Sequence, residues 1–364
     1  MYSKEEKIIM WLSSFDFMSY KKAMSLISNF DDLVDVFDNI AKYRTQLLKI
    51  FTEEEYSYLK NDANFVYIDM VIKNYDDLGI TVVTYKSDGY PNLLKEISVP
   101  PIMLYCKGDI SLLKTECLSV VGTRRATTYG KNAGSKIIKE VASHDITIVS
   151  GLAEGIDTVA HKATLEAKGK TIAVLGGGLL NIYPKSNIKL AEDIIENGGL
   201  LVSEYKPNEP PLTYHFPIRN RIIAGLSKAV FVVEATEKSG SMHTKNYALD
   251  YNREVFALPA RVTDIYSVGC NKIIANGQAR MLLDVSEIID FFGKNINKNS
   301  EVRAIQLTSD EQIIYSTLDG MELHFDDIVQ RTKLETKVLQ TCLMRMEIKG
   351  ILRKLPGNYY ELIR

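Results

Sequence analysis

Short runs of hydrophobic residues alternate with helical stretches through the middle of the chain. Between residues 117 and 260 the runs are CLSVVG, ITIVSG, TIAVLGG, LLVSEY, AVFVVEA and EVFALPA. Near-continuous Val, Ile and Leu are typical of strands buried on both faces, and helices of about 10–15 residues between them supply parallel crossovers. The pattern predicts an α/β fold with a doubly wound, Rossmann-like parallel sheet.

Different patterns flank this region. Residues 1–78 combine short apolar-periodic stretches with acidic breaks, which predicts a small helical domain. The main domain is predicted at 79–292, and its first two runs, ITVVTY and IMLYCKG, predict short strands. The polar segment 293–306 predicts a linker. Residues 307–364 predict three helices and a hairpin, the pattern of a winged-helix domain.

Composition and charge limit the classes of function. The formal net charge of the 364 residues is -2, so a nucleic-acid site would have to be a local positive patch. Four cysteines without a CxxC pair and five isolated histidines predict neither a bound metal nor a disulfide framework. We find neither a secretory leader nor an apolar run of about 18 residues, and therefore expect a soluble cytoplasmic protein without a membrane segment.

Glycine and polar residues cluster directly after the predicted strands. In an open parallel sheet a ligand binds beyond the carboxyl ends of the strands. Glycine lets backbone N–H groups approach an anion, and helix N-termini add positive dipole ends. The segments concerned are 122–125, 150–157, 176–187 and 239–241. They predict a phosphate site, although any single glycine could instead serve only a tight turn.

The common nucleotide-cofactor signatures are absent from the sequence. No G-x-G-x-x-G follows the first of these strands, and no acidic residue ends the second strand to hold a ribose hydroxyl. No G-x-x-x-x-G-K-[ST] motif of a P-loop occurs either. We therefore expect no cofactor, and a phosphate site that serves another ligand.

Cationic side chains near the same segments favour a polyanion. Arg219 and Arg221 flank Asn220 at the start of a predicted helix, where the alternative is a salt bridge. Further cations that would converge on this edge are Arg124, Arg125, Lys185 and Lys189. A single strand of nucleic acid also needs stacking surfaces, for which the candidates are Tyr183, Tyr205 and Phe216.

Five motifs follow one another between residues 122 and 244: GTR, SGxAxGID, GGG-x4-YPKSN, FPxRNRIIAGLS and VxEA-x3-SGS-x2-T. This ordered series resembles the DNA-processing protein A (DprA/Smf) family. YPNLL, PPIMLYCKGD and GCNKIIANG extend the resemblance over residues 79–292. The resemblance implies a SAM-like domain at 1–78 and a homodimer that binds single-stranded DNA without altering it. It also implies protection of incoming DNA and loading of the RecA recombinase during natural transformation.

The resemblance also implies which residues contact DNA. Carried over position by position, they are Gly122, Arg124, Ser150, Gly151, Lys185, Asn187, Arg219, Asn220, Arg221, Ser239, Gly240 and Thr244. Arg125 and Lys189 join the set because they lie beside these motifs.

Some residues leave other functions open. Asp157 and His161 share a helix face and could bind a metal or transfer protons, although capping explains the carboxylate equally well. Glu234 at a strand end would suit a nucleotide-processing hydrolase, which is the alternative function. A third possibility is a duplex-binding regulator acting through basic residues of the winged helix, which could equally be solvated or dock a protein: Lys337, Arg345, Lys349, Arg353 and Lys354.

Overall fold

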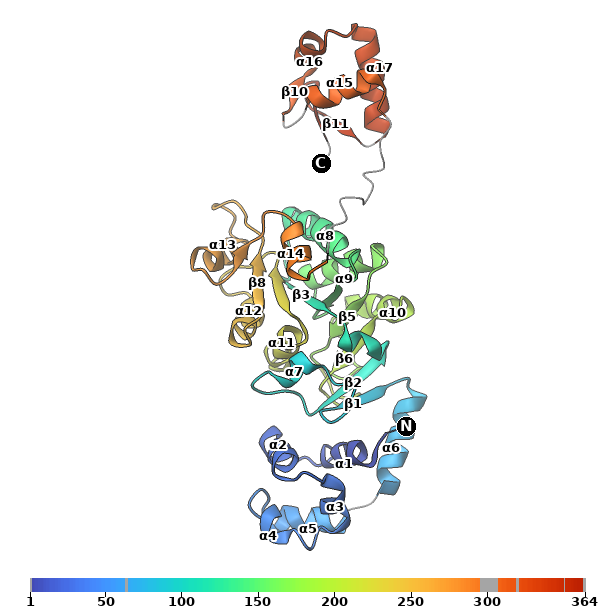
Figure 1. The fold of residues 1–364 in the computed structure, drawn as a ribbon, viewed down its shortest axis with the longest axis vertical. Helices are drawn as coiled ribbons and strands as arrows, with labels where there is room; N and C mark the ends of the chain where they lie inside the picture. Colours follow the sequence, from blue (N-terminus) through green and yellow to red (C-terminus); the bar gives the residue numbers. More distant parts are fainter. Residues whose placement is uncertain (1, 63–64, 295–306, 319–320, 350, 363–364) are drawn as a thin grey trace. The chain divides into compact units, whose positions relative to one another are not determined.

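The computed structural model describes residues 2–62, 65–294, 307–318, 321–349 and 351–362 (Figure 1). Contacts divide the chain into two compact units, Met1–Asn295 and Ile296–Arg364. Apart from its first two residues, the predicted linker 293–306 lies outside the described residues. The predicted domain boundary at residue 78 falls between a helix and a strand of the first unit, where it stays a prediction.

The first unit begins with helices, two of which start at capping motifs that can be recognised in the sequence. Ser3 with Glu6, and Thr52 with Glu55, form reciprocal capping boxes. The helices are α1 (Lys4–Leu12), α2 (Tyr20–Asn29), α3 (Leu33–Asp38), α4 (Arg44–Leu47), α5 (Glu53–Asn61) and α6 (Phe65–Asp77). The helical pattern predicted for this region is therefore present.

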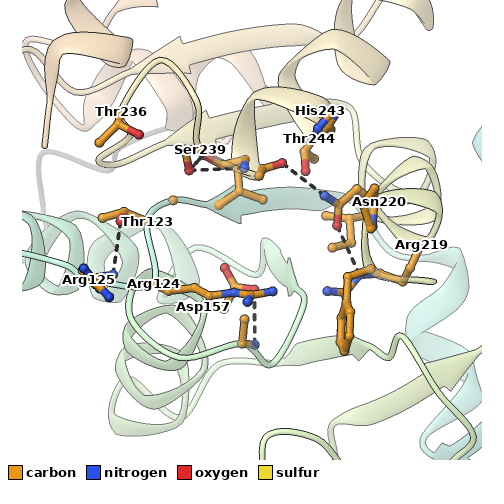
Figure 2. A pocket seen from close by; sticks show the side chains of 18 of the residues that line it. Thr123, Arg124, Arg125, Asp157, Arg219, Asn220, Thr236, Ser239, His243 and Thr244 are labelled. Carbon is orange, nitrogen blue, oxygen red and sulfur yellow. Dashed lines mark hydrogen bonds between the residues drawn. The ribbon is translucent and has the colours of Figure 1, made fainter. Parts of the chain in front are cut away.

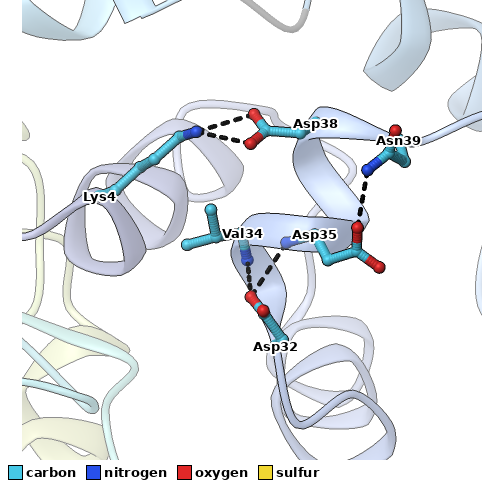
Figure 3. Close-up of polar contacts among 6 residues, drawn as sticks. All are labelled: Lys4, Asp32, Val34, Asp35, Asp38 and Asn39. Carbon is cyan, nitrogen blue, oxygen red and sulfur yellow. Dashed lines mark hydrogen bonds and ion pairs between the residues drawn. The ribbon is translucent and has the colours of Figure 1, made fainter.

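Polar contacts join the first and third of these helices. Figure 3 shows the Asp32 carboxylate accepting hydrogen bonds from the N–H groups of Val34 and Asp35, at 2.8 and 2.9 Å, at the start of α3. The Lys4 ammonium pairs with Asp38 at 2.6 Å. Both partners of that pair are about half exposed, so packing rather than this ion pair holds the helices together.

A nine-stranded sheet follows, in the order β1-β2-β6-β5-β4-β3-β7-β8-β9. Its strands are β1 (Thr81–Thr84), β2 (Met103–Gly108), β3 (Cys117–Val121), β4 (Thr147–Ser150), β5 (Thr171–Val174), β6 (Leu200–Ser203), β7 (Ala229–Val232), β8 (Glu254–Ala257) and β9 (Arg280–Met281). All residues of β3 to β7 are buried, as their apolar runs predict. One hydrophobic cluster continues from the N-terminal helices into one face of this sheet.

The sheet is mixed rather than wholly parallel. Strands β3 to β9 pair in parallel, but β1 pairs with β2, and β2 with β6, in antiparallel fashion. The two leading strands extend the sheet beyond β6, and the sequence pattern does not reveal their direction. Strand β9 spans only two exposed residues, too few for a hydrophobic pattern.

Helices cover both faces of the sheet. Both α9 and α11 contact β3, β4 and β5; α8 and α10 pack beside α9, whereas α7 and α12 pack beside α11. The elements are α7 (Asn92–Lys95), η1 (Ile110–Lys114), α8 (Thr128–Ala142), α9 (Ile156–Glu166), η2 (Lys185–Asn187), α10 (Ile188–Glu196), α11 (His215–Leu226), α12 (Ser241–Asp250), α13 (Val268–Ala275) and α14 (Ser286–Phe291). In the ranges that the structure describes, no helix is long and apolar enough to span a membrane.

The direction of winding reverses beside β3. From β3 the chain proceeds through β4, β5 and β6 on one side, and then returns to place β7 on the other side of β3. The segments that follow β3 and β7 therefore diverge, and such a reversal opens a crevice at the carboxyl ends of the strands.

The second unit is a winged helix. Three helices pack on a small sheet of strand order β10-β12-β11, around Leu339, Leu343 and Tyr360. Its elements are α15 (Ser309–Thr317), β10 (Leu323–His324), α16 (Phe325–Thr332), α17 (Thr336–Ile348), β11 (Leu352–Leu355) and β12 (Tyr359–Leu362). The three predicted helices and the hairpin are confirmed, and β10 is an addition too short to predict.

Replacing Leu118 with alanine tests the central core. Leu118 lies on β3 with no exposed surface, so Leu118→Ala should lower the free energy of unfolding by about 2–5 kcal/mol. Met70 on α6 is 66% exposed, and Met70→Ala should change that free energy by no more than about 0.5 kcal/mol. Urea denaturation followed by circular dichroism measures both, and equal losses would contradict the assignment of Leu118 to the core.

Candidate nucleic-acid interface

A cavity of about 550 Å³ occupies the crevice between the ends of β3 and β7. Its walls come from four places: the segment after β3, the segment after β4, the first half of α11, and the segment from β7 into α12. Figure 2 shows Thr236, Ser239 and Thr244 on one side of this space, and Arg124 and Asp157 on the other. Side chains far apart in the sequence therefore meet at one site.

Most of the residues predicted to contact DNA line this cavity. They are Gly122, Arg124, Arg125, Arg219, Asn220, Ser239, Gly240 and Thr244. The expected convergence of positive charge on one edge of the sheet thus applies to three arginines.

Three other predicted residues lie beside the cavity in structural contacts. The Ser150 hydroxyl donates to the Val120 carbonyl at 2.7 Å, and Gly151 lines a small adjoining pocket. The Asn187 amide donates to the Leu152 carbonyl at 2.8 Å and is buried. These contacts shape the loops around the cavity.

The remaining three predicted residues are cations outside the lining of the cavity. Lys189 is paired on α10 with Asp193, at 3.0 Å. Arg221 is buried against Glu204 on the side of α11 away from the cavity lining. Lys185 is exposed and has no ion-pair partner in the described part of the chain. Contact of these residues with DNA stays a prediction.

Arg219 forms the floor of the cavity and is only 4% exposed. Its Nη1 donates to the carbonyl of Gly151, at 2.9 Å, and to the carbonyl of Val174, while Nε donates to the Asn220 side chain at 3.2 Å. Burial lowers its pKa to about 10, against the opposing effect of the nearby Asp157 carboxylate. Arg219 is therefore still charged at neutral pH.

Arg124 and Arg125 are exposed at the mouth of the cavity. Neither has an ion-pair partner among the residues that the structure describes. The Arg124 guanidinium lies 5.8 Å from the centre of the Phe216 ring, which in turn lies 5.5 Å from the Tyr183 ring. Tyr183 is 50% exposed, so two aromatic rings and an arginine plane are available for stacking.

Tyr205, the third predicted stacking residue, packs against another side chain outside the cavity. Its ring stacks on His215 with a centroid distance of 3.8 Å, and its hydroxyl is buried. It is not among the residues that line the cavity.

The glycines of the site serve different purposes. A Cβ on Gly122 would lie 2.5 Å from Ile156, so this glycine permits close packing of β3 on α9. A Cβ on Gly151 would lie 2.6 Å from Nη2 of Arg219, so this glycine makes room for the guanidinium. Gly240 at the start of α12 has open space around it, and a ligand can approach there.

Asp157 and His161 do not form a metal centre. The Asp157 carboxylate lines the cavity, but His161 is fully buried and its Nδ1 lies 2.8 Å from the Thr171 hydroxyl. Burial lowers the His161 pKa to about 3, and raises the pKa of Asp157. Within the described ranges, no three His, Cys, Asp or Glu side chains are grouped to hold a metal ion.

Glu234, the predicted carboxylate of a hydrolase, has a structural role. It is fully buried and accepts hydrogen bonds from the N–H and hydroxyl of Thr127, at 2.8 and 2.7 Å, at the start of α8. It does not line the cavity. Its placement therefore removes the observation that favoured nucleotide hydrolysis.

The basic residues of the winged helix divide into two groups. Lys349 pairs with Glu311, and Arg353 with Glu361. The others, Lys337, Arg345 and Lys354, are exposed. Their arrangement leaves open whether this unit contacts DNA or a protein.

Several residues that line the cavity were not among those predicted from the sequence, namely Thr213, Thr236 and His243. Thr236 and His243 fall in the variable positions of the last motif, so that motif gave no reason to select them. The signal that could have found them is position, because residues between a strand end and the first turn of the next helix face the crevice.

Comparisons with known proteins identify relatives of both units. The family model described as DNA recombination-mediator protein A matches residues 81–293, and the DprA winged helix domain matches residues 299–358. DNA processing protein DprA of Bacillus subtilis (strain 168) is 42% identical over 235 residues, which are 64% of this chain and 78% of the relative. The predicted Rossmann-like domain and the predicted winged-helix domain therefore both match known families.

Two solved structures share the fold. The crystal structure of DprA from Streptococcus pneumoniae is 33% identical, with a TM-score of 0.65 over 77% of this chain and 96% of that chain. A structure of DNA processing protein A from Helicobacter pylori, concerned with its single-stranded DNA binding mode, is also 33% identical. Its TM-score is 0.54, over 59% of this chain and 96% of that chain. The predicted Rossmann-like fold is confirmed.

Replacing His161 tests its burial beneath the cavity. A free histidine has a pKa of about 6.5, whereas that of His161 is about 3 in the folded protein. Between these pH values the unfolded chain binds a proton that the folded chain does not, so the free energy of unfolding falls as the pH is lowered. In His161→Gln this fall should be shallower, as measured by urea denaturation across that range. His144→Gln, at a partly exposed site outside the cavity, should leave the steep fall in place, and an unchanged slope in His161→Gln would contradict the prediction.

Proposed function

Because this chain belongs to the DNA recombination-mediator protein A (DprA/Smf) family, we propose that it binds single-stranded DNA in the cavity between β3 and β7, without chemically altering the strand. The observation that carries the proposal is the set of three arginines that line one cavity of a chain whose net charge is -2. Lys and Arg groups that neutralise phosphates supply the sequence-independent part of such binding.

The aromatic residues support a single strand over a duplex. Bases of a single strand are free to stack, and Phe216 and Tyr183 present ring surface beside the guanidinium of Arg124. The open start of α12 at Gly240 adds backbone N–H groups that can hold a phosphate. One site therefore offers aromatic rings on which a base can stack and N–H groups that can bind a phosphate.

In the cell, this binding would protect incoming DNA and load the RecA recombinase onto it during natural transformation. The family relationship supports this role. A loader has to hold a strand and then release it, and exposed arginines at the mouth of a cavity suit reversible contact with phosphates.

We further propose that the protein acts as a homodimer through the β9 edge of its sheet. Met281 and Leu283 are 42% and 75% exposed there, and Phe291 on the neighbouring α14 is 40% exposed. At the opposite edge, the Tyr2 hydroxyl accepts a hydrogen bond from the N–H of Val82 on β1, at 2.8 Å. The apolar edge at β9 is therefore the better candidate for self-association.

Arg124→Ala tests the DNA site. Loss of one phosphate-binding guanidinium should weaken binding of a labelled thymine oligomer about tenfold at low salt. It should also reduce the slope of log affinity against log salt by about 1. Fluorescence anisotropy measures both quantities, and nuclease protection of the strand should decline in parallel.

The matched control is Lys139→Ala. Lys139 is a half-exposed cation on α8 that pairs with Glu166 and lies outside the cavity. This variant should bind the oligomer as the parent chain does. Equal affinity of Arg124→Ala and the parent chain at low salt would show that the cavity is not the DNA site.

Leu283→Arg tests the proposed dimer. A charge at the centre of an apolar contact is costly to bury, so the variant should elute as a monomer where the parent chain elutes as a dimer. Light scattering coupled to size exclusion measures the mass. Met70→Arg, at an exposed site on α6, should leave the mass unchanged; a dimeric Leu283→Arg would place the interface elsewhere.

A further inference from the structure

One carboxylate stands among the cations of the cavity. Of the described residues that line it, Asp157 alone carries an acidic side chain. The other polar groups of the lining are arginines, hydroxyls, an amide and a histidine, nearly all of which can donate hydrogen bonds. A site that bound only phosphate would lose attraction through this negative charge, so Asp157 calls for a different explanation.

The position of Asp157 in the fold accounts for part of its role. It lies in the first turn of α9, where a carboxylate favours the helix dipole. Its Oδ2 accepts a hydrogen bond from the Ala153 N–H at 3.3 Å, a long contact, and contacts with Ser150 and Gly151 also oppose the rise of its pKa on burial. The Ser150 proton itself is directed to the Val120 carbonyl. These local contacts occupy part of the acceptor capacity of the carboxylate.

The carboxylate keeps capacity to accept further hydrogen bonds. An ionised carboxylate offers about four lone-pair sites on two oxygens. The Asp157 carboxylate and the Arg219 guanidinium both lie beside Gly151 and attract each other, but in the described part of the chain no ion pair within 4.0 Å joins Asp157 to Arg219 or Arg124. Figure 2 shows its side chain among those that face the cavity. Asp157 is only 8% exposed, so a ligand with N–H donors can reach it only from within the cavity.

The neighbouring rings identify the kind of donor. Phe216 lines the same cavity, and with Tyr183 it forms a surface on which a base can stack. Of the four bases, guanine presents two adjacent donors, N1–H and the exocyclic amine, that match two carboxylate oxygens. Thymine offers one ring N–H, and adenine and cytosine offer one amine.

We propose that Asp157 makes this cavity selective for guanine, accepting hydrogen bonds from N1–H and the exocyclic amine of a stacked base. The arginines meanwhile hold the adjoining phosphates. This inference rests on the proposed binding of single-stranded DNA and adds base selectivity to it.

Base substitution tests the inference on the unmodified full chain. The probes are labelled thymine oligomers that carry guanine, hypoxanthine or adenine at every third position, compared by fluorescence anisotropy. The guanine oligomer should bind about fivefold more tightly than the adenine oligomer, the lower end for a bidentate base contact. The hypoxanthine oligomer, which keeps N1–H but lacks the amine, should fall between them.

The outcomes separate the two proposals. Equal affinities for the three oligomers would overturn guanine selectivity and leave the proposed DNA binding intact. No binding to any oligomer would overturn the proposed function itself.

Variants separate hydrogen bonding from charge. Asp157→Asn should bring the affinity ratio of guanine to adenine oligomers close to one, while raising affinity for the adenine oligomer because a negative charge is gone. Glu154→Gln removes an exposed carboxylate from the same loop, outside the main cavity, and should raise both affinities equally. If Asp157→Asn only reproduces this equal rise, Asp157 acts as a charge and the inference is wrong.

Discussion

The buried guanidinium of Arg219 is the contact on which the site depends. It joins the carbonyl groups of Gly151 and Val174, at the ends of two neighbouring strands, and it also holds the Asn220 side chain. Asn220 in turn donates to the Gly240 carbonyl at the start of α12, at 3.3 Å. The reversal in the winding of the sheet thus becomes a bounded cavity, because α11 is tied to the ends of β4 and β5 on one side and to the start of α12 on the other.

Pairing of charges explains how a nearly neutral chain forms a local positive site. Arg221 and Lys189 are close in sequence to residues of the cavity, yet both are engaged by carboxylates. Arg124 and Arg125 lack such partners in the described ranges, and they stand at the mouth. The positive patch is defined by which cations remain unpaired, and the count of cations along the chain does not reveal it.

The fold could be predicted largely from the sequence because each buried strand is a continuous apolar run that tolerates few other structures. The site could be predicted in part. Motif membership selected Arg219 and Asn187 alike, although one faces the cavity and the other holds a loop. The side on which a residue of a short turn lies depends on packing partners distant in sequence, such as Ile156 against Gly122. No local pattern contains that information.

Asp157 shows how a site can combine affinity with discrimination. Phosphate contacts are the same for every nucleotide, so cations alone cannot distinguish bases. A carboxylate near those cations reduces their attraction for phosphate. The cost of burying the charged Asp157 is smaller because the nearby Arg219 opposes the rise of its pKa. The same arginine that assembles the cavity therefore also allows a buried acid to persist there. Selectivity at this position follows from acceptor geometry, and affinity follows from the net positive charge around it.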